Sequence, residues 1–242
     1  MAQLLDSTLV MEDPCPYLHD RPACMEHRYL CGVSPEETEA LLIRGWRRFG
    51  LLYFRPVCEA CTECVSLRIP VADFSPGKTQ RRVWRKGAAF EVTVGAPQVD
   101  DERLALFHRW HMMHTERRGW PMTDTSEESY RWSFVQSHPC AREMCYRIDG
   151  KLVAVGLVDL TPSALSSTYF YYAPEIDDFS PGTFSILCEI EYARSVGRAH
   201  VYLGYRVAGC PSVAYKDRFR PHEILVGRPE IHHQPVWTPS GA

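Results

Sequence analysis

The sequence has no long apolar run and no excess of positive charge. None of its hydrophobic stretches approaches the roughly 20 residues that cross a bilayer, and the opening MAQLLDSTLVMEDP lacks the basic flank and apolar segment of a secretory signal. We therefore expect a cytoplasmic protein with no membrane partner. Lys and Arg number 27 against 30 Asp and Glu, which gives a formal net charge of −3. Any role with nucleic acid must therefore rest on a local basic stripe.

A disulfide framework is equally unexpected. The chain has 242 residues, 45% of them hydrophobic, which is enough for a sizeable packed core without covalent cross-links. Thiols in the cytosol also stay reduced. The ten cysteines are therefore left with two roles, metal ligation or plain burial.

Three of these cysteines follow a C-x-x-C-x-x-C pattern in the stretch CEACTEC, at Cys58, Cys61 and Cys64. This spacing gathers thiolates around one ion or cluster without long loops. The best fourth ligand is Cys15, ahead of Cys24 and Cys31. Zinc and an iron–sulfur cluster both accept four thiolates, and buried thiols without a ligand remain an equal alternative.

Apolar periodicity and capping signals predict the regular elements. We expect helices within residues 34–50, 75–87, 101–119, 125–137 and 183–197. We expect strands within residues 51–56, 65–74, 90–95, 142–148, 151–160, 165–173, 200–207 and 223–227. The first 33 residues show neither period, and the segment after Gly227 is expected to be loosely docked.

The order of these elements predicts an α+β fold. From residue 101 it runs helix, helix, three strands, helix, strand, strand, which fits helices packed on one mixed, mainly antiparallel sheet. The same order occurs in acetyltransferase-like (GNAT-type) domains. We expect a smaller N-terminal α/β domain with the cysteines at residues 1–95, a C-terminal domain at residues 96–228 and a tail at residues 229–242.

A basic stripe lies on the predicted helix of residues 75–87. Four cations fall on one helical face by their spacing: Lys78, Arg81, Arg82 and Arg85. They suit a phosphate backbone, although a solvated helix surface explains them equally well. Trp84 on the same helix is more typical of a core residue than of a base-stacking one. Three histidines of residues 101–119 do not share one face with a carboxylate, so we reject a metal site there.

A second cationic stretch follows the predicted strand of residues 200–207. The loop AGCPSVAYKDRFRP carries Tyr215, Lys216, Arg218 and Arg220 near the end of the sheet. Charged side chains held there by a rigid scaffold suit the recognition of a carboxylate or phosphate. Loop cations in solvent are the alternative.

Taken together, three motifs resemble a known family. CEACTEC with SLRIPVADFSPGKTQRRVWRKG, then SPGTFSILCEIEYARSVG, and then YLGYRVAGCPSVAYKDRFRPHEIL are similar in order and spacing to the aminoacyl-tRNA–protein transferases related to arginyltransferase. The resemblance spans residues 15–227 and is strongest to bacterial members that act on aspartate and glutamate with leucine.

The resemblance implies an enzyme of protein degradation, the N-degron pathway. Such enzymes move an amino acid from an aminoacyl-tRNA to the α-amine of a protein that begins with Asp or Glu. The bacterial-type CPYL and Q-R-R patterns suggest leucine as the donor, and arginine is the alternative. The transfer requires no cofactor, but the family's cysteines have been implicated in metal or iron–sulfur binding, which favours such a site at Cys15, Cys58, Cys61 and Cys64.

The resemblance also suggests site roles, with some departures. The stretch from Ser212 to Lys216 lacks two cations of the family's usual K-M-R-Y-K run, and a P-G-K-T sequence precedes Gln80. We expect the cations of the 75–87 helix, with Gln80, to hold the tRNA acceptor end. Tyr205, Tyr215 or backbone N–H groups are expected to stabilise the oxyanion. Lys216 or Arg220, with Arg68 in reserve, is expected to pair with the acidic side chain of the acceptor.

Two other functions are compatible with the same fold. A coenzyme-A-dependent N-acetyltransferase would grip pyrophosphate with a glycine-rich turn, whereas the corresponding DDFSPGTFS has one glycine and two acidic residues. A non-enzymatic, metal-stabilised tRNA-binding module would bind tRNA and transfer nothing. Oligomeric state has no signature in the sequence.

Overall fold

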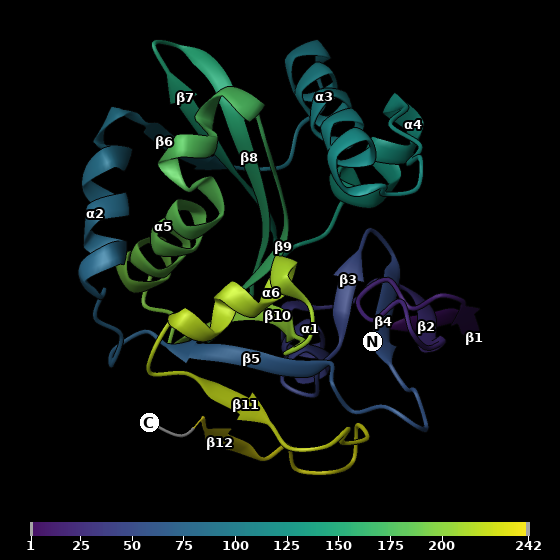
Figure 1. Ribbon diagram of the computed structural model, residues 1–242. Helices are drawn as coiled ribbons and strands as arrows, with labels where there is room; N and C mark the ends of the chain where they lie inside the picture. The colour runs from purple at the N-terminus through teal and green to yellow at the C-terminus, as the bar shows by residue number, and fades with distance from the viewer. Residues whose placement is uncertain (1, 241–242) are drawn as a thin grey trace.

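The strands form two sheets. The computed structural model describes residues 2–240 (Figure 1). The smaller sheet is antiparallel, in the order β1 (Gln3–Glu12), β2 (Ala23–Cys31), β4 (Leu52–Pro56) and β3 (Arg47–Phe49). The larger sheet has the order β12 (Trp237–Pro239), β11 (Glu223–Leu225), β5 (Val65–Pro70), β10 (His200–Arg206), β9 (Ala164–Tyr172), β8 (Lys151–Leu160), β7 (Ala141–Ile148) and β6 (Glu91–Gly95). Its neighbouring strands within residues 2–240 are antiparallel, except that β9 and β10 are parallel.

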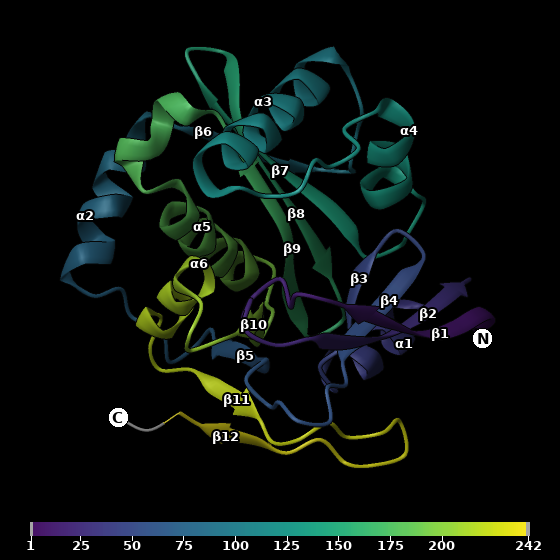
Figure 2. The same cartoon turned by 45° about the vertical axis from the view of Figure 1, so that its right-hand side comes forward.

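Helices cover both faces of the larger sheet (Figures 1 and 2). The α-helices are α1 (Pro35–Leu42), α2 (Lys78–Lys86), α3 (Asp101–Arg118), α4 (Glu127–Tyr130), α5 (Pro181–Ser195) and α6 (Pro211–Ala214). The 3₁₀ helices are η1 (Gly87–Ala89), η3 (Pro174–Phe179) and η4 (Tyr215–Arg218), and η2 (Arg131–Val135) is a π-helix. Phe107 of α3 packs on Tyr171 of β9, whereas Phe184 of α5 packs on Tyr146, which contacts Phe170 of β9. No helix within residues 2–240 is long and apolar enough to cross a membrane.

The α+β class with a mainly antiparallel sheet is confirmed. The predicted domain boundary between residues 95 and 96 comes directly after β6. Because β5 and β6 both belong to the larger sheet, this boundary does not separate the two sheets. The expected loose docking of the tail is wrong for its last described part. Trp237 pairs within the β11–β12 ladder, and its Nε1 donates to the Ile43 carbonyl at 3.1 Å.

The predicted helix of residues 34–50 is correct at its start and wrong at its end. Ser34 and Glu37 form the predicted capping box, with Glu37 N–H donating to Ser34 Oγ at 3.2 Å. The helix stops at Leu42, and Gly45, with φ of +85°, turns the chain into β3. Pairing with β4 and burial of Trp46 outweigh local helix propensity there.

Strand β3 docks the smaller sheet on the larger one. Its central residue, Arg48, is buried and forms an ion pair with buried Asp159 of β8, with Nε at 3.1 Å from Oδ2. Phe49 packs against Tyr169 of β9 and Phe134, with ring centroids 6.0 and 6.1 Å away. This three-residue strand therefore places its first residue, Arg47, against the middle of the larger sheet.

Candidate functional site

The site lies where β9 and β10 part. The two strands pair only where His200–Tyr202 faces Ala164–Ser166. The register between β10 and β5 shifts between Tyr202 and Tyr205. The register between β9 and β8 also shifts, at the position of Ser167. Beyond Ser166 the two backbones are no longer hydrogen-bonded to each other. Their free groups must therefore be satisfied by side chains or a ligand.

Arg47 enters this region from β3. Its Nη2 donates to the Ser167 carbonyl. The guanidinium lies against Gly204, where a Cβ would be in ordinary contact 3.5 Å from Arg47 Nη2, and the φ of +76° at this position favours glycine. No carboxylate within residues 2–240 lies within 4 Å of this guanidinium. Burial lowers its pKa from the usual value, so Arg47 is a desolvated cation without an anionic partner.

Glu189 of α5 and Lys216 of η4 lie in the same region. Glu189 is 1% exposed, its Oε1 accepts from Ser167 Oγ at 3.2 Å, and its Oε2 has no hydrogen-bond partner. Burial raises the pKa of Glu189 to about 8. Lys216 Nζ donates to the Tyr205 carbonyl at 3.3 Å, and burial followed by Arg47 lowers its pKa to about 8. At neutral pH a carboxyl with a pKa near 8 is mostly protonated, whereas an amine with a pKa near 8 is mostly charged. Arg47 and Lys216 are therefore both cations in this region.

The two predicted tyrosines differ in what their hydroxyls do. Tyr205 is buried, and its hydroxyl donates to the Gly45 carbonyl at 2.8 Å, so that donor is already committed to the fold. The Tyr215 hydroxyl has no hydrogen-bond partner within residues 2–240 and lies near the start of α5, 3.5 Å from where a Cβ on Gly182 would be. Burial raises the pKa of Tyr215 to about 12. Tyr215 is therefore a protonated hydroxyl with a free donor.

The cations of α2 form an exposed surface. Lys78, Arg81, Arg82 and Arg85 are all exposed, and none has a carboxylate partner in the described part of the chain. Gln80 instead points inward, where its Nε2 donates to the Arg218 carbonyl at 3.2 Å. This bond ties α2 to the loop that carries Tyr215 and Lys216. Trp84 is 43% exposed and packs partly against Phe184.

Two of the predicted cations lie apart from Arg47. Arg68 donates to Glu223 at 2.6 Å and to the Tyr202 hydroxyl at 3.0 Å, and its guanidinium lies 4.4 Å from the Trp237 ring centroid. Arg68 therefore joins β5 to β11 by an ion pair, and its other contacts are with Tyr202 of β10 and Trp237 of β12. Arg220 is exposed in the loop before β11.

Four cysteines line one small cavity of about 20 Å³, with Tyr17 and Arg228: Cys15, Cys58, Cys61 and Cys64. Arg228 donates to the carbonyls of Cys58 and Cys61 at 2.8 and 2.7 Å and so holds the loop. The donor set fits a four-thiolate site in kind and number. No group of three His, Cys, Asp or Glu in residues 2–240 is arranged to hold a metal. The Cys58 thiol instead accepts from Cys24 N–H at 3.2 Å.

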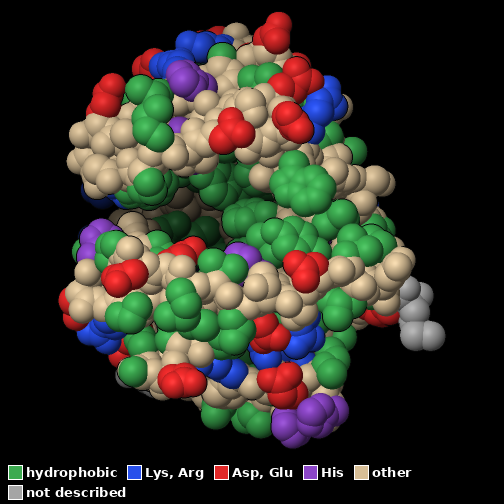
Figure 3. Space-filling model, turned by 90° about the vertical axis from the view of Figure 1, so that its right-hand side faces the viewer, with side chains coloured by type: hydrophobic (Ala, Val, Ile, Leu, Met, Phe, Trp, Pro, Cys, Tyr) green, Lys and Arg blue, Asp and Glu red, His purple; other side chains and the backbone are tan. Residues whose placement is uncertain are grey.

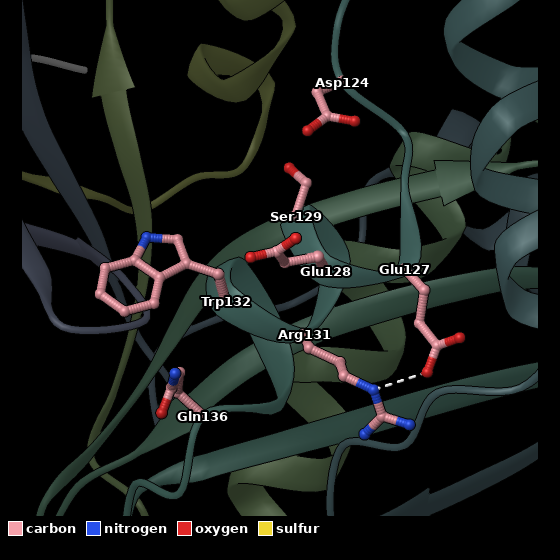
Figure 4. A pocket seen from close by; sticks show the side chains of 7 residues that line it. All are labelled: Asp124, Glu127, Glu128, Ser129, Arg131, Trp132 and Gln136. Carbon is pink, nitrogen blue, oxygen red and sulfur yellow. Dashed lines mark hydrogen bonds and ion pairs between the residues drawn. The ribbon is translucent and has the colours of Figure 1, made fainter.

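The surface is hollowed on the side shown in Figure 3. The hollow lies between the part that carries α3 and α4 and the part that carries the smaller sheet, and its visible walls are mainly hydrophobic. A separate open pocket of about 770 Å³ lies beside α4 (Figure 4). Three carboxylates line it, and its one arginine, Arg131, is paired with Glu127 at 2.7 Å. Its negative charge makes it unsuitable for an anionic ligand.

Two site residues have different signals in the sequence. Nothing in the sequence marks Arg47 as a site residue, because the segment RGWRRFG is predicted to continue the preceding helix. Glu189 has a signal, because it stands between buried positions of a helix, at Ile186 and Ile190, where a lone carboxyl is costly unless it has a function.

Family models match most of the chain. The model described as arginine-tRNA-protein transferase, N terminus, matches residues 13–82, and the one described as arginine-tRNA-protein transferase, C terminus, matches residues 102–226. The aspartate/glutamate leucyltransferase of Campylobacter jejuni is 37% identical over 227 residues, which cover 93% of this chain and 95% of that protein. The protein of the same name from Helicobacter hepaticus is 34% identical, with 92% and 93% covered.

Solved structures are more distant. L-PGS from Bacillus licheniformis is 13% identical, with a TM-score of 0.48 over 73% of this chain and 58% of that one. A GCN5-related N-acetyltransferase from Kribbella flavida is 14% identical, with a TM-score of 0.35 over 60% and 55%.

The buried carboxyl of Glu189 makes stability depend on pH. Its folded pKa is raised to about 8, above the unfolded value near 4.5, so the folded state binds the extra proton between these limits. The free energy of unfolding therefore falls as pH rises through this window, by up to about 1.4 kcal/mol per pH unit. Glu189→Gln should remove this contribution in urea unfolding at pH 5, 6, 7 and 8. Exposed Glu191→Gln on the same helix is the control, and equal slopes in both variants would contradict the assignment.

Proposed function

Because the chain belongs to the arginine-tRNA-protein transferase family and is therefore an aminoacyltransferase, we propose that it transfers leucine from leucyl-tRNA to proteins that begin with Asp or Glu. The relatives that this chain matches over nearly their whole length are named leucyltransferases, which supports leucine as the donor amino acid. Arginine, which names the family models, is the second donor to be tested. The product would enter the N-degron pathway, in the cytoplasm where charged tRNA is made.

The reaction needs placement more than activation. The acceptor's α-amine attacks the ester carbonyl carbon of the aminoacyl-tRNA, the new C–N bond forms, and the bond to the ribose oxygen breaks. The attacking nitrogen loses a proton, and the leaving ribose oxygen gains one. Since the ester is already activated, holding the amine at attack distance supplies much of the acceleration.

The charged surface of α2 supports tRNA binding. The exposed cations of α2 have no carboxylate partners among the described residues, so they are free to neutralise phosphates. The Gln80–Arg218 bond holds this surface beside the loop of Tyr215 and Lys216. A tRNA acceptor end on α2 would therefore reach the region where β9 and β10 part.

The free hydroxyl of Tyr215 supports a role in stabilising the oxyanion. It is protonated at neutral pH, since burial raises its pKa to about 12, and no described group competes for its proton. A positioned donor of this kind contributes on the order of 3 kcal/mol to transition-state stabilisation. Tyr205 is not available for this role because its hydroxyl is bound to Gly45.

An acyl-coenzyme A is the less favoured donor. Helix α5 begins at Pro181, which has no N–H, and Ser180 makes no side-chain cap there. Asp177 and Asp178 precede it and are exposed. These features oppose pyrophosphate at the helix start.

The cysteine cavity supports a proposed zinc ion or iron–sulfur cluster held by Cys15, Cys58, Cys61 and Cys64. Such a group would cross-link the loop before β2 to the loop before β5. Tyr17 lies in that first loop, lines the cavity and interacts electrostatically with Arg47. The group is therefore proposed to order the structure around the site, and the transfer itself takes place without it.

The first test is a matrix of donors and acceptors. Leucyl-, arginyl- and phenylalanyl-tRNA are each incubated with peptides that begin with Asp, Glu or Ala, and the products are weighed by mass spectrometry. We expect the Asp and Glu peptides to gain the mass of one leucine residue. Arginine addition instead would assign the other donor, and no addition from any tRNA would refute the proposed activity.

Charge reversal on α2 tests the tRNA surface. Arg81→Glu with Arg82→Glu should lower kcat/KM for leucyl-tRNA by about 100-fold or more, since two phosphate contacts become repulsive, and should flatten the dependence on salt. Both residues are exposed, so the circular dichroism spectrum should be unchanged. The matched control is Arg118→Glu with Lys151→Glu, two exposed cations that, like those of α2, have no ion pair among the described residues. Undiminished transfer in the α2 variant would exclude this surface.

Elemental analysis tests the cysteine site. Protein purified without oxygen should contain zinc, or iron with sulfide, in proportion to chain, and Cys61→Ser should lose it. Cys31→Ser is the control, because Cys31 bonds to Gln3 away from the cavity. Metal-free wild-type protein, or equal metal in both variants, would contradict the proposal.

A further inference from the structure

Arg47 is a cation of this site whose hydrogen bond goes to a backbone carbonyl and not to a carboxylate. We propose that its guanidinium binds the side-chain carboxylate of the acceptor's N-terminal Asp or Glu, and that it is the residue that makes the enzyme select acidic N-termini. This inference rests on the proposed function and assigns its specificity to one residue outside the motifs recognised in the sequence.

The position of Arg47 is built into the fold. Arg48, next to it, is fixed by the buried ion pair with Asp159, and Phe49 is fixed by Tyr169 and Phe134. On the other side the guanidinium lies against the backbone at Gly204. The guanidinium is therefore held in one place and needs little further ordering to bind a ligand.

The charges around Arg47 leave room for one carboxylate. Asp159 is bound by Arg48, and Glu189 is bound by Ser167 and is largely protonated at neutral pH. Lys216 donates to a backbone carbonyl. A guanidinium can still offer two parallel N–H groups to a carboxylate. Its partial burial strengthens that interaction relative to water.

An acceptor carboxylate explains Arg47 better than a tRNA phosphate. Phosphates would meet the several exposed cations of α2, which suit a nucleic-acid backbone, whereas Arg47 lies in the region between β9 and β10 with Lys216 as its cationic neighbour. Glu189 interacts electrostatically with both Arg47 and Tyr215, so the two side chains lie in the same region. An acidic residue bound by Arg47 would bring its α-amine into the same region as the free Tyr215 hydroxyl.

The experiment compares acids with their neutral amides. Transfer of leucine to otherwise identical peptides beginning with Asp, Asn, Glu or Gln is measured for wild type, Arg47→Gln and Arg47→Lys. In wild type the Asp and Glu peptides should exceed their amides in kcat/KM. Arg47→Gln should reduce the Asp-to-Asn ratio by about 30-fold or more, the usual effect of removing one partner of a desolvated charge pair. Arg47→Lys should restore part of the ratio, because the charge returns without the bidentate geometry.

Arg206→Gln is the matched control. Arg206 is an arginine of β10 whose charge is already paired with Asp217 at 2.8 Å, so the Asp-to-Asn ratio should stay at the wild-type value. Calorimetry of the same four peptides with each protein, without tRNA, should show the same loss of acid preference in Arg47→Gln. This measurement reports on Arg47 even if leucine transfer is absent, so failure of the proposed function is seen separately.

Two results would overturn the inference. If Arg47→Gln lowers transfer to all four peptides equally and also lowers the melting temperature, Arg47 has a structural role only. If the ratio is unchanged and KM for leucyl-tRNA rises, Arg47 binds the nucleic acid. If Arg47→Gln loses the preference for Asp over Asn in both kinetics and calorimetry, the assignment is supported.

Discussion

The buried ion pair between Arg48 and Asp159 holds the two sheets together. Their side chains are 8% and 6% exposed, and removing one partner of such a pair typically costs about 3–5 kcal/mol because a buried charge is left alone. The pair fixes strand β3 on β8. Since neighbouring residues of a strand point to opposite sides, it also fixes Arg47 and Phe49. The site therefore depends on an interaction between residues 111 positions apart.

Arginines of this chain differ in what their charges contact. Arg48, Arg55, Arg68 and Arg103 are paired with carboxylates and join elements that are distant in the sequence. Arg47 and the arginines of α2 have no carboxylate partner in the described chain. Burying or clustering unpaired cations is costly, and binding an anion offsets that cost. An acidic peptide and a tRNA bring the two kinds of anion that such groups require.

Long periodic segments could be predicted from the sequence, and short ones held by distant contacts could not. Helices α3 and α5 and strands β7 to β9 carry strong local patterns, and the Asp149-Gly150 turn has the positive φ values, 48° and 77°, that its sequence requires. The β1–β2 hairpin was missed because β1 is exposed on both faces and has a register shift between Leu4 and Asp6. Three-residue β3 was missed because its stability comes from β4, β8 and β9.

The same distinction applies to the site. The exposed cations of α2 and the loop of Cys58, Cys61 and Cys64 follow from local spacing. That Cys15 lines the same cavity depends on contacts between distant parts of the chain. The bonds that tie Gln80, Arg68 and Tyr205 into the fold could not be predicted from local spacing, because each joins residues more than 100 positions apart. Arg47 and Glu189 become recognisable only when β3, β9 and α5 are brought together.

The central claim is that the parting of β9 and β10 receives the acidic N-terminal residue beside the charged end of tRNA. A crystal structure with a peptide beginning with Asp and a non-hydrolysable leucyl-adenosine tests it most directly. The account predicts that the Asp carboxylate lies on Arg47, with the peptide's amine and the leucyl carbonyl meeting next to Tyr215. A peptide bound elsewhere, with Arg47 free, would contradict it.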